Sequence, residues 1–179
     1  MASLVRAYKY RLYPTATQRR LMEETLETCR RWYNICLAER KEAWENEKLS
    51  LSFYDQEKGI KVYRQENEYA ARVVYAALLL TTQDLDKAFK NFFRRVKAGQ
   101  KPGYPRFKGR DRFDSFGYPH YGNGYKIDGR RLKLTNIGRV SVRWHRPLEG
   151  EIKQLRICRH AGKWYACFSC EVEPKPLPP

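Results

Sequence analysis

The side chains able to do nucleophilic, acid–base or metal chemistry are five cysteines, three histidines and twenty carboxylates. His120, His145 and His160 have no nucleophile or ligand at a recognised spacing, so each fits a surface or nucleic-acid contact better than a catalyst. Cys167 and Cys170 have the spacing of zinc ligands, but they fall in an alternating stretch where residues three apart point to opposite faces of a strand. No phosphate-binding loop, dinucleotide fingerprint or nucleophile elbow occurs. The residue pattern therefore predicts a binding module.

The distribution of basic residues along the chain points to a ligand. Residues 87–163 contain 21 Lys and Arg against 5 Asp and Glu, whereas residues 1–86 are nearly balanced at 14 against 13. Solubility needs only a modest net charge with both signs mixed, so this segregation indicates a polyanionic partner. Nucleic acid is favoured over a membrane because no isolated basic amphipathic segment is present.

Two adjoining patterns between residues 85 and 110 provide the candidate contacts. A basic stripe steps by three and four residues, as one face of a helix does, and suits a phosphate backbone. Gly99 and Pro102 predict the helix end, and an extended arm of alternating basic and aromatic residues follows. For one stripe alone, a solvated helix face is the simpler explanation. The predicted nucleic-acid-binding residues are Lys87, Lys90, Arg94, Arg95, Lys97, Lys101, Tyr104, Arg106, Phe107, Lys108 and Arg110.

A helix is expected to position the first part of this region, and strands are expected in the remainder of the chain. Periodicity predicts a strand over 5–12 and helices over 16–46, 53–66 and 69–97, the last with an inward apolar face that continues to Val96. Further strands are expected over residues 115–118, 125–127, 131–134, 138–144, 152–159 and 163–172. Short strands with regular turns predict a small barrel. The N-terminal strand is expected to join it, so the helices become an insertion.

The expected fold class is therefore α+β, with a single barrel interrupted by helices. Residues 1–14 would be the first barrel strand, 15–101 an inserted helical recognition lobe, 102–173 the rest of the barrel domain, and 174–179 a linker or tail. The odd cysteine count at irregular spacing does not resemble a disulfide framework. The longest apolar run is far shorter than the roughly 20 residues of a membrane span, and no signal peptide is visible, which predicts a cytoplasmic protein.

Five motifs occur in an order that resembles TnpB, the OrfB-type protein of bacterial insertion sequences, related to type V CRISPR effectors. They are Arg11-Leu12-Tyr13-Pro14, Arg31-Trp32-Tyr33-Asn34, 85–95, 103–108, and 129–134 followed by Ile137-Gly138. The resemblance covers essentially the whole chain. It implies a wedge-type, OB-like β-barrel with an inserted recognition lobe, described in older terms as a helix-turn-helix transposase domain. In that family these lobes hold the guide RNA and read duplex DNA flanking the target; the equivalent positions here are Tyr54, Tyr75, Tyr118 and Tyr121.

A full-length TnpB continues into a RuvC-like nuclease domain and a zinc ribbon, which would begin about where this chain ends, at Pro179. The resemblance implies RNA-guided DNA cleavage by the intact protein of a transposable element. It also implies that this chain has no catalytic residues and binds neither Mg nor Zn itself. Expected partners are guide RNA, target DNA and, if the nuclease is encoded separately, a nuclease-domain chain. The alternatives are a nuclease-free DNA-binding regulator of the same family and, less favoured, an unrelated cationic RNA-binding protein.

Overall fold

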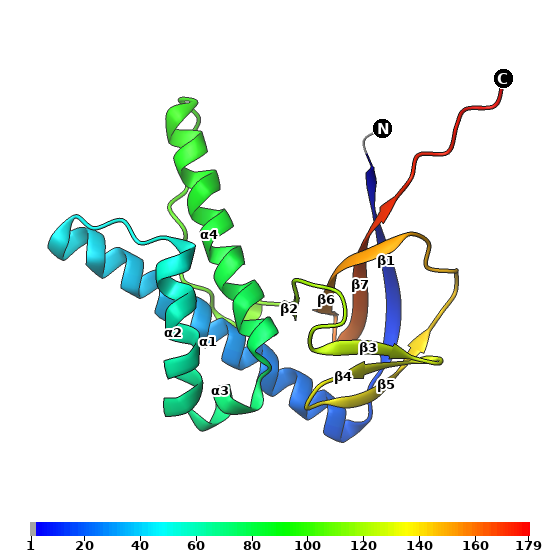
Figure 1. The fold of residues 1–179 in the computed structure, drawn as a ribbon. Coiled ribbons are helices and arrows are strands. Elements are labelled where there is room, and N and C mark those ends of the chain that lie inside the picture. Colours follow the sequence, from blue (N-terminus) through cyan, green and yellow to red (C-terminus); the bar gives the residue numbers. More distant parts are fainter. Residues whose placement is uncertain (1–2) are drawn as a thin grey trace. The chain divides into compact units, whose positions relative to one another are not determined.

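The computed structural model describes residues 3–179, which form two compact units (Figure 1). The barrel unit comprises residues 3–22 and Asp114–Pro179, and the helical unit comprises Glu23–Phe113. This arrangement confirms an α+β fold in which the helices interrupt a barrel between its first and second strands. The helical unit extends to Phe113 because residues 102–113 pack on its helices; the domain limits at 101 and 102 stay a prediction.

Seven antiparallel strands make a nearly closed barrel in the barrel unit. They are β1 (Leu4–Tyr13), β2 (Ser115–Tyr118), β3 (Tyr125–Asp128), β4 (Arg131–Leu134), β5 (Gly138–Arg143), β6 (Glu151–His160) and β7 (Lys163–Val172), in the order β2-β6-β7-β1-β5-β4-β3. In Figure 1 the blue β1 lies beside β7, with Leu4 opposite Val172 and Leu12 opposite Trp164. At the two sheet edges, the rings of Tyr118 and Tyr125 lie 5.3 Å apart. The prediction that the N-terminal strand joins the barrel is confirmed.

Alternating side chains fill the barrel. On β1, Tyr8, Tyr10 and Leu12 are buried while Lys9 is exposed, and on β7 the inward set begins with Trp164. Cys170 belongs to that inward set and Cys167 does not, as the strand geometry predicts. The Sγ of Cys167 instead lies 3.4 Å from that of Cys158 on β6. Within residues 3–179, no group of three His, Cys, Asp or Glu side chains is placed to hold a metal ion.

The first helix, α1 (Ala16–Glu47), begins in the barrel unit with the predicted capping box. The backbone N–H of Gln18 donates to Thr15 Oγ1 at 3.2 Å, and the N–H of Thr15 donates to Gln18 Oε1 at 3.0 Å. Gln18 Nε2 also donates to the carbonyl of Arg139 on β5 at 2.8 Å. The start of α1 is thereby hydrogen-bonded to the barrel wall.

The helical unit contains the rest of α1, then α2 (Phe53–Glu66), α3 (Glu68–Arg72), α4 (Tyr75–Lys97) and the 3₁₀ turn η1 (Arg110–Arg112). The prediction of one helix over 69–97 is wrong, because Val73 and Val74 are extended, with ψ of 133° and 144°. Consecutive β-branched residues favour extended backbone. In addition, the Asn67 side chain accepts from the N–H groups of Tyr69 and Ala70 and starts α3 as a separate helix.

The interior of this unit is built mainly by α1 and α4. Trp32 on α1 donates from Nε1 to Thr82 Oγ1 at 2.8 Å, and its ring stacks on Tyr63 of α2 at 4.7 Å. On α4, Leu85 and Phe89 are buried, but Phe93 and Val96 are about half exposed. The predicted buried face therefore ends earlier than expected, because the last turns of α4 extend past the packed helices. No helix within residues 3–179 is long and apolar enough to cross a membrane.

Candidate nucleic-acid interface

The predicted basic stripe is present on the exposed side of α4. Lys87, Lys90, Arg94 and Lys97 are all exposed and recur at steps of three and four residues along the helix. Lys101 is exposed but lies beyond the helix end at Lys97, so it cannot extend the stripe as a helical residue. The basic residues of the last turn, among them Arg95, also complement the negative end of the helix dipole. That stabilising effect is independent of any ligand.

The predicted arm is fixed to α1 through its main chain. Asn34 brackets Lys108: its Oδ1 accepts from the backbone N–H at 2.8 Å and its Nδ2 donates to the carbonyl at 2.9 Å. Arg30 Nη1 donates to the same carbonyl at 2.9 Å. These three bonds hold the backbone and leave the Lys108 side chain available, with Nζ 5.9 Å from the centre of the Tyr33 ring.

Other arm side chains divide between packing and exposure. The Tyr104 ring makes edge contacts with Phe89 at 5.5 Å and Phe92 at 5.3 Å. Arg106 and Phe107 are exposed, and Lys41 Nζ lies 5.9 Å from the Phe107 ring centre. The arm therefore presents basic and aromatic groups from a backbone that is already ordered, which lowers the entropy cost of binding.

A single carboxylate, Glu27, organises three arginines beside the arm. Its Oε1 lies 2.6 Å from Arg30, 3.1 Å from Arg31 and 3.7 Å from Arg110. The hydrogen bond from Arg30 is the main cause that lowers the pKa of Glu27 to about 2; partial burial opposes it, and the other arginines add to it. One negative charge among three positive ones leaves this surface cationic.

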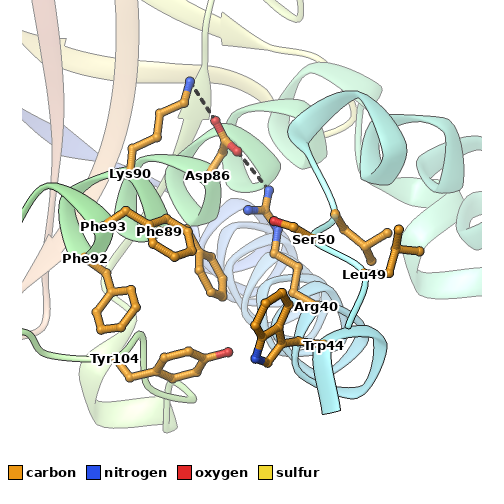
Figure 2. A pocket seen from close by; sticks show the side chains of 11 residues that line it. Arg40, Trp44, Leu49, Ser50, Asp86, Phe89, Lys90, Phe92, Phe93 and Tyr104 are labelled. Carbon is orange, nitrogen blue, oxygen red and sulfur yellow. Dashed lines mark hydrogen bonds and ion pairs between the residues drawn. The ribbon is translucent and has the colours of Figure 1, made fainter. Parts of the chain in front are cut away.

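Beside the stripe, α1 with the loop that follows it, α4 and the arm line a cavity of about 660 Å³, shown in Figure 2. Aromatic and aliphatic side chains make most of its wall. The lining residues are Arg40, Trp44, Leu49, Ser50, Leu51, Asp86, Phe89, Lys90, Phe92, Phe93 and Tyr104. We call it the aromatic pocket.

Three charged side chains meet at one end of the aromatic pocket (Figure 2). Arg40, only 7% exposed, donates from Nη2 to Asp86 Oδ1 at 2.9 Å and from Nε to Gln56 Oε1 at 2.6 Å. Lys90 Nζ lies 3.0 Å from Asp86 Oδ2. Burial alone raises the pKa of Asp86, but the bonds from Arg40 and Lys90 outweigh it, so that pKa is lowered. The carboxylate therefore stays ionised between two cations.

The four predicted duplex-contacting tyrosines differ in accessibility. Tyr54 and Tyr75, in the helical unit, and Tyr121, in the barrel unit, are exposed. Tyr118 is only 1% exposed and packs against Phe116 and Tyr125, so its burial contradicts the predicted duplex contact. It ends β2 and fills the barrel, where it cannot reach a duplex.

Sequence reasoning missed the groups that hold these side chains in place. Asn34 and Arg30 anchor the arm, and Arg40 with Asp86 closes one end of the aromatic pocket. Asn34 lies within the motif Arg31-Trp32-Tyr33-Asn34, which was the available signal. The charge alternation along α1 hid Arg40, because it matches a solvated helix face.

Comparisons with known proteins agree with the motifs. The family model for the helix-turn-helix domain of OrfB from IS605 matches residues 1–48. A protein of Escherichia coli (strain K12) named RNA-guided DNA endonuclease InsQ is 28% identical over 173 residues, covering 94% of this chain and 41% of that protein. A Streptomyces pristinaespiralis protein named RNA-guided DNA endonuclease is 29% identical over 184 residues, covering 99% and 44%. The resemblance to the TnpB/OrfB family is confirmed.

The chain spans less than half the length of these two relatives. A solved Cas12f1–sgRNA–target DNA complex is also similar, at a TM-score of 0.46 and 11% identity, over 96% of this chain and 49% of that one. Over the residues matched by the helix-turn-helix model, the structure has β1 followed by the 32-residue α1. The described part of that match therefore contains one helix.

Proposed function

We propose that these residues are the nucleic-acid-binding half of a TnpB-like RNA-guided DNA endonuclease of a transposable element. In this proposal they hold a guide RNA and the DNA that flanks the target. The observation that carries the binding role is the exposed stripe on α4 beside an arm whose backbone Asn34 holds in place. The names of relatives that match over nearly the whole chain support the link to RNA-guided cleavage.

The stripe and the arm contribute different interactions. Lys87, Arg94 and Lys97 neutralise successive phosphates and release counterions, which gives affinity without sequence preference. Phe107 and Arg106 offer an exposed ring and a guanidinium to unpaired bases. The exposed tyrosines at 54, 75 and 121 are assigned to the flanking DNA. Metal-dependent cleavage, with any Mg or Zn, is assigned to residues outside these 179, and the protein is assigned to the cytoplasm.

A salt titration of RNA binding tests the phosphate contacts. Lys87→Ala/Arg94→Ala should lower affinity and reduce the slope of log K against log salt by about 2, since each lost phosphate contact removes about 1. Lys58→Ala/Lys61→Ala, on the exposed side of α2, removes the same charge as a matched control and should leave the slope nearly unchanged. Equal slopes for both variants would contradict the assignment.

The identity of the bound nucleic acid tests the guide-RNA role. The protein is purified from its host and the nucleic acid that accompanies it is sequenced. One discrete structured RNA encoded beside the gene is expected. A mixed RNA population, together with preference for one duplex DNA motif, would instead favour a nuclease-free regulator.

A further inference from the structure

The aromatic pocket has walls from three segments that are distant in sequence. Trp44 comes from α1, Phe92 and Phe93 from the end of α4, and Tyr104 from the arm. Trp44 is 53% exposed and Phe93 54% exposed, so large ring surfaces face solvent. In Figure 2 the Tyr104 ring lies next to Trp44 in the view, with its hydroxyl directed towards the indole. A planar aromatic ligand can pack against these ring surfaces.

The charged end of the aromatic pocket favours a ligand that is polar as well as planar. Asp86 there accepts from Arg40 and Lys90. The Lys90 side chain is 77% exposed, and an apolar peptide segment covering it would remove its hydration without supplying a partner. A nucleobase has donor and acceptor groups on its edges and apolar faces for stacking.

Charge around the opening favours an anionic chain attached to that ligand. Lys90 belongs both to the pocket wall and to the α4 stripe, so the two features are continuous. Lys48 Nζ adds another cation, 5.5 Å from the centre of the Trp44 ring. The volume of about 660 Å³ lies within the range of pockets that enclose small ligands, and it suits one nucleotide.

We propose that the aromatic pocket binds one unpaired nucleobase of a nucleic-acid strand whose phosphates lie along the α4 stripe. The inference rests on the proposed nucleic-acid-binding function and deepens it. The base packs against the ring surfaces of Trp44 and Tyr104, while Asp86 and Arg40 meet its polar edge. The stripe then supplies affinity for any strand, and the pocket adds a requirement for a base.

Octaadenylate RNA and an abasic octamer with the same number of phosphates separate the two contributions. The parent protein should bind octaadenylate roughly tenfold more tightly, because stacking of one base is lost in the abasic strand. Trp44→Leu and Tyr104→Leu should each reduce that ratio towards one and keep the salt slope. Tyr69→Leu, a matched change at an exposed tyrosine of α3 outside the pocket, should preserve both. The same ratio measured with a deoxyadenylate octamer and its abasic counterpart shows whether the pocket prefers an RNA or a DNA strand.

The results also separate failure of this inference from failure of the proposed function. The parent protein could bind both octamers with a clear salt dependence but with equal affinity. That result would overturn the pocket assignment alone. The pocket assignment would also be overturned if the pocket variants lost affinity for both octamers equally. The same holds if the parent protein is a dimer and the Trp44→Leu variant is a monomer. No binding of either octamer would overturn both proposals.

Photocrosslinking tests the same contact without a substitution. RNA containing 4-thiouridine is irradiated with the parent protein, and the attached peptides are mapped by mass spectrometry. Crosslinks at Trp44, Phe93 or Tyr104 are expected. Crosslinks confined to residues outside the aromatic pocket would overturn the inference.

Discussion

Asn34 pairs with both backbone groups of Lys108, accepting from its N–H at 2.8 Å and donating to its carbonyl at 2.9 Å. A side-chain amide thus substitutes for a neighbouring strand over one residue of the arm. The lysine side chain is left to reach a ligand. The Asn34 amide is therefore a positioning group: it orders the backbone from which the arm's cationic and aromatic side chains project.

Replacing Asn34 by alanine should release the arm and leave the helices folded. The Lys108 amide should lose protection from hydrogen exchange, and trypsin should cleave faster after Arg106 and Lys108. Asn46→Ala, at an exposed position of the same helix, is the matched control and should change neither rate. An unchanged cleavage pattern in the Asn34 variant would show that the other contacts of the arm, among them the bond from Arg30, hold it without Asn34.

Asp86→Asn should destabilise the helical unit. It removes the charge that offsets the buried Arg40 guanidinium, and charge-assisted hydrogen bonds of this kind contribute about 1.5–3 kcal/mol. Urea denaturation should give a lower midpoint with an unchanged m-value. Glu42→Gln removes a carboxylate from an exposed site on α1 and should shift the midpoint little. Equal midpoints for the two variants would contradict a stabilising role for the pair.

Acid should remove the stabilising contribution of Glu27. Its pKa is lowered in the folded protein from 4.5 to about 2, so its contribution is complete above pH 4.5 and declines as the pH falls towards 2. Asp86 acts in the same direction. Glu27→Gln should therefore be less stable than the parent near pH 6, with the difference shrinking below pH 4. The check is a set of unfolding curves at several pH values. If the arginines do not stabilise the charged form of Glu27, the difference in stability between variant and parent should be the same at every pH.

Tyr10→Phe should raise the stability of the barrel. The Tyr10 side chain is fully buried, and its hydroxyl has no hydrogen-bond partner within residues 3–179. Removing an unsatisfied buried hydroxyl should stabilise the protein by about 1 kcal/mol, seen as a higher Tm. Tyr165→Phe removes a hydroxyl from the half-exposed outer face and should have little effect. A lower Tm for Tyr10→Phe would indicate that the hydroxyl binds an internal water.

Local patterns predicted the strands well because each strand alternates and ends at a turn residue. The bounds of β2, β4 and β7 agree with the expected ranges residue for residue. The break between α3 and α4 at Val73 and Val74 was not predicted, because both valines are apolar and continue the helical pattern that predicts burial. The cap formed by Asn67 was the clearer signal, since its side chain starts a new helix.

The candidate site was predicted only in part because its support comes from distant residues. The stripe on α4 is local and could be recognised from its spacing. The bond from Asn34 to Lys108 joins residues 74 positions apart, which no periodicity reports. Phe93 was assigned to a buried face because its spacing is that of Phe89, yet nothing in that spacing tells where the neighbouring helices end.

The pairing of β1 with β7 constrains how the protein folds during its synthesis. Leu4 pairs with Val172, and the neighbours of β1 in the sheet are β7 and β5. Both strands are translated after the entire helical unit. The helical unit can therefore fold while β1 is still unpaired. Sheet closure over such a sequence separation is slow, because the intervening chain must first be ordered. The first strand to leave the ribosome is therefore among the last to be paired.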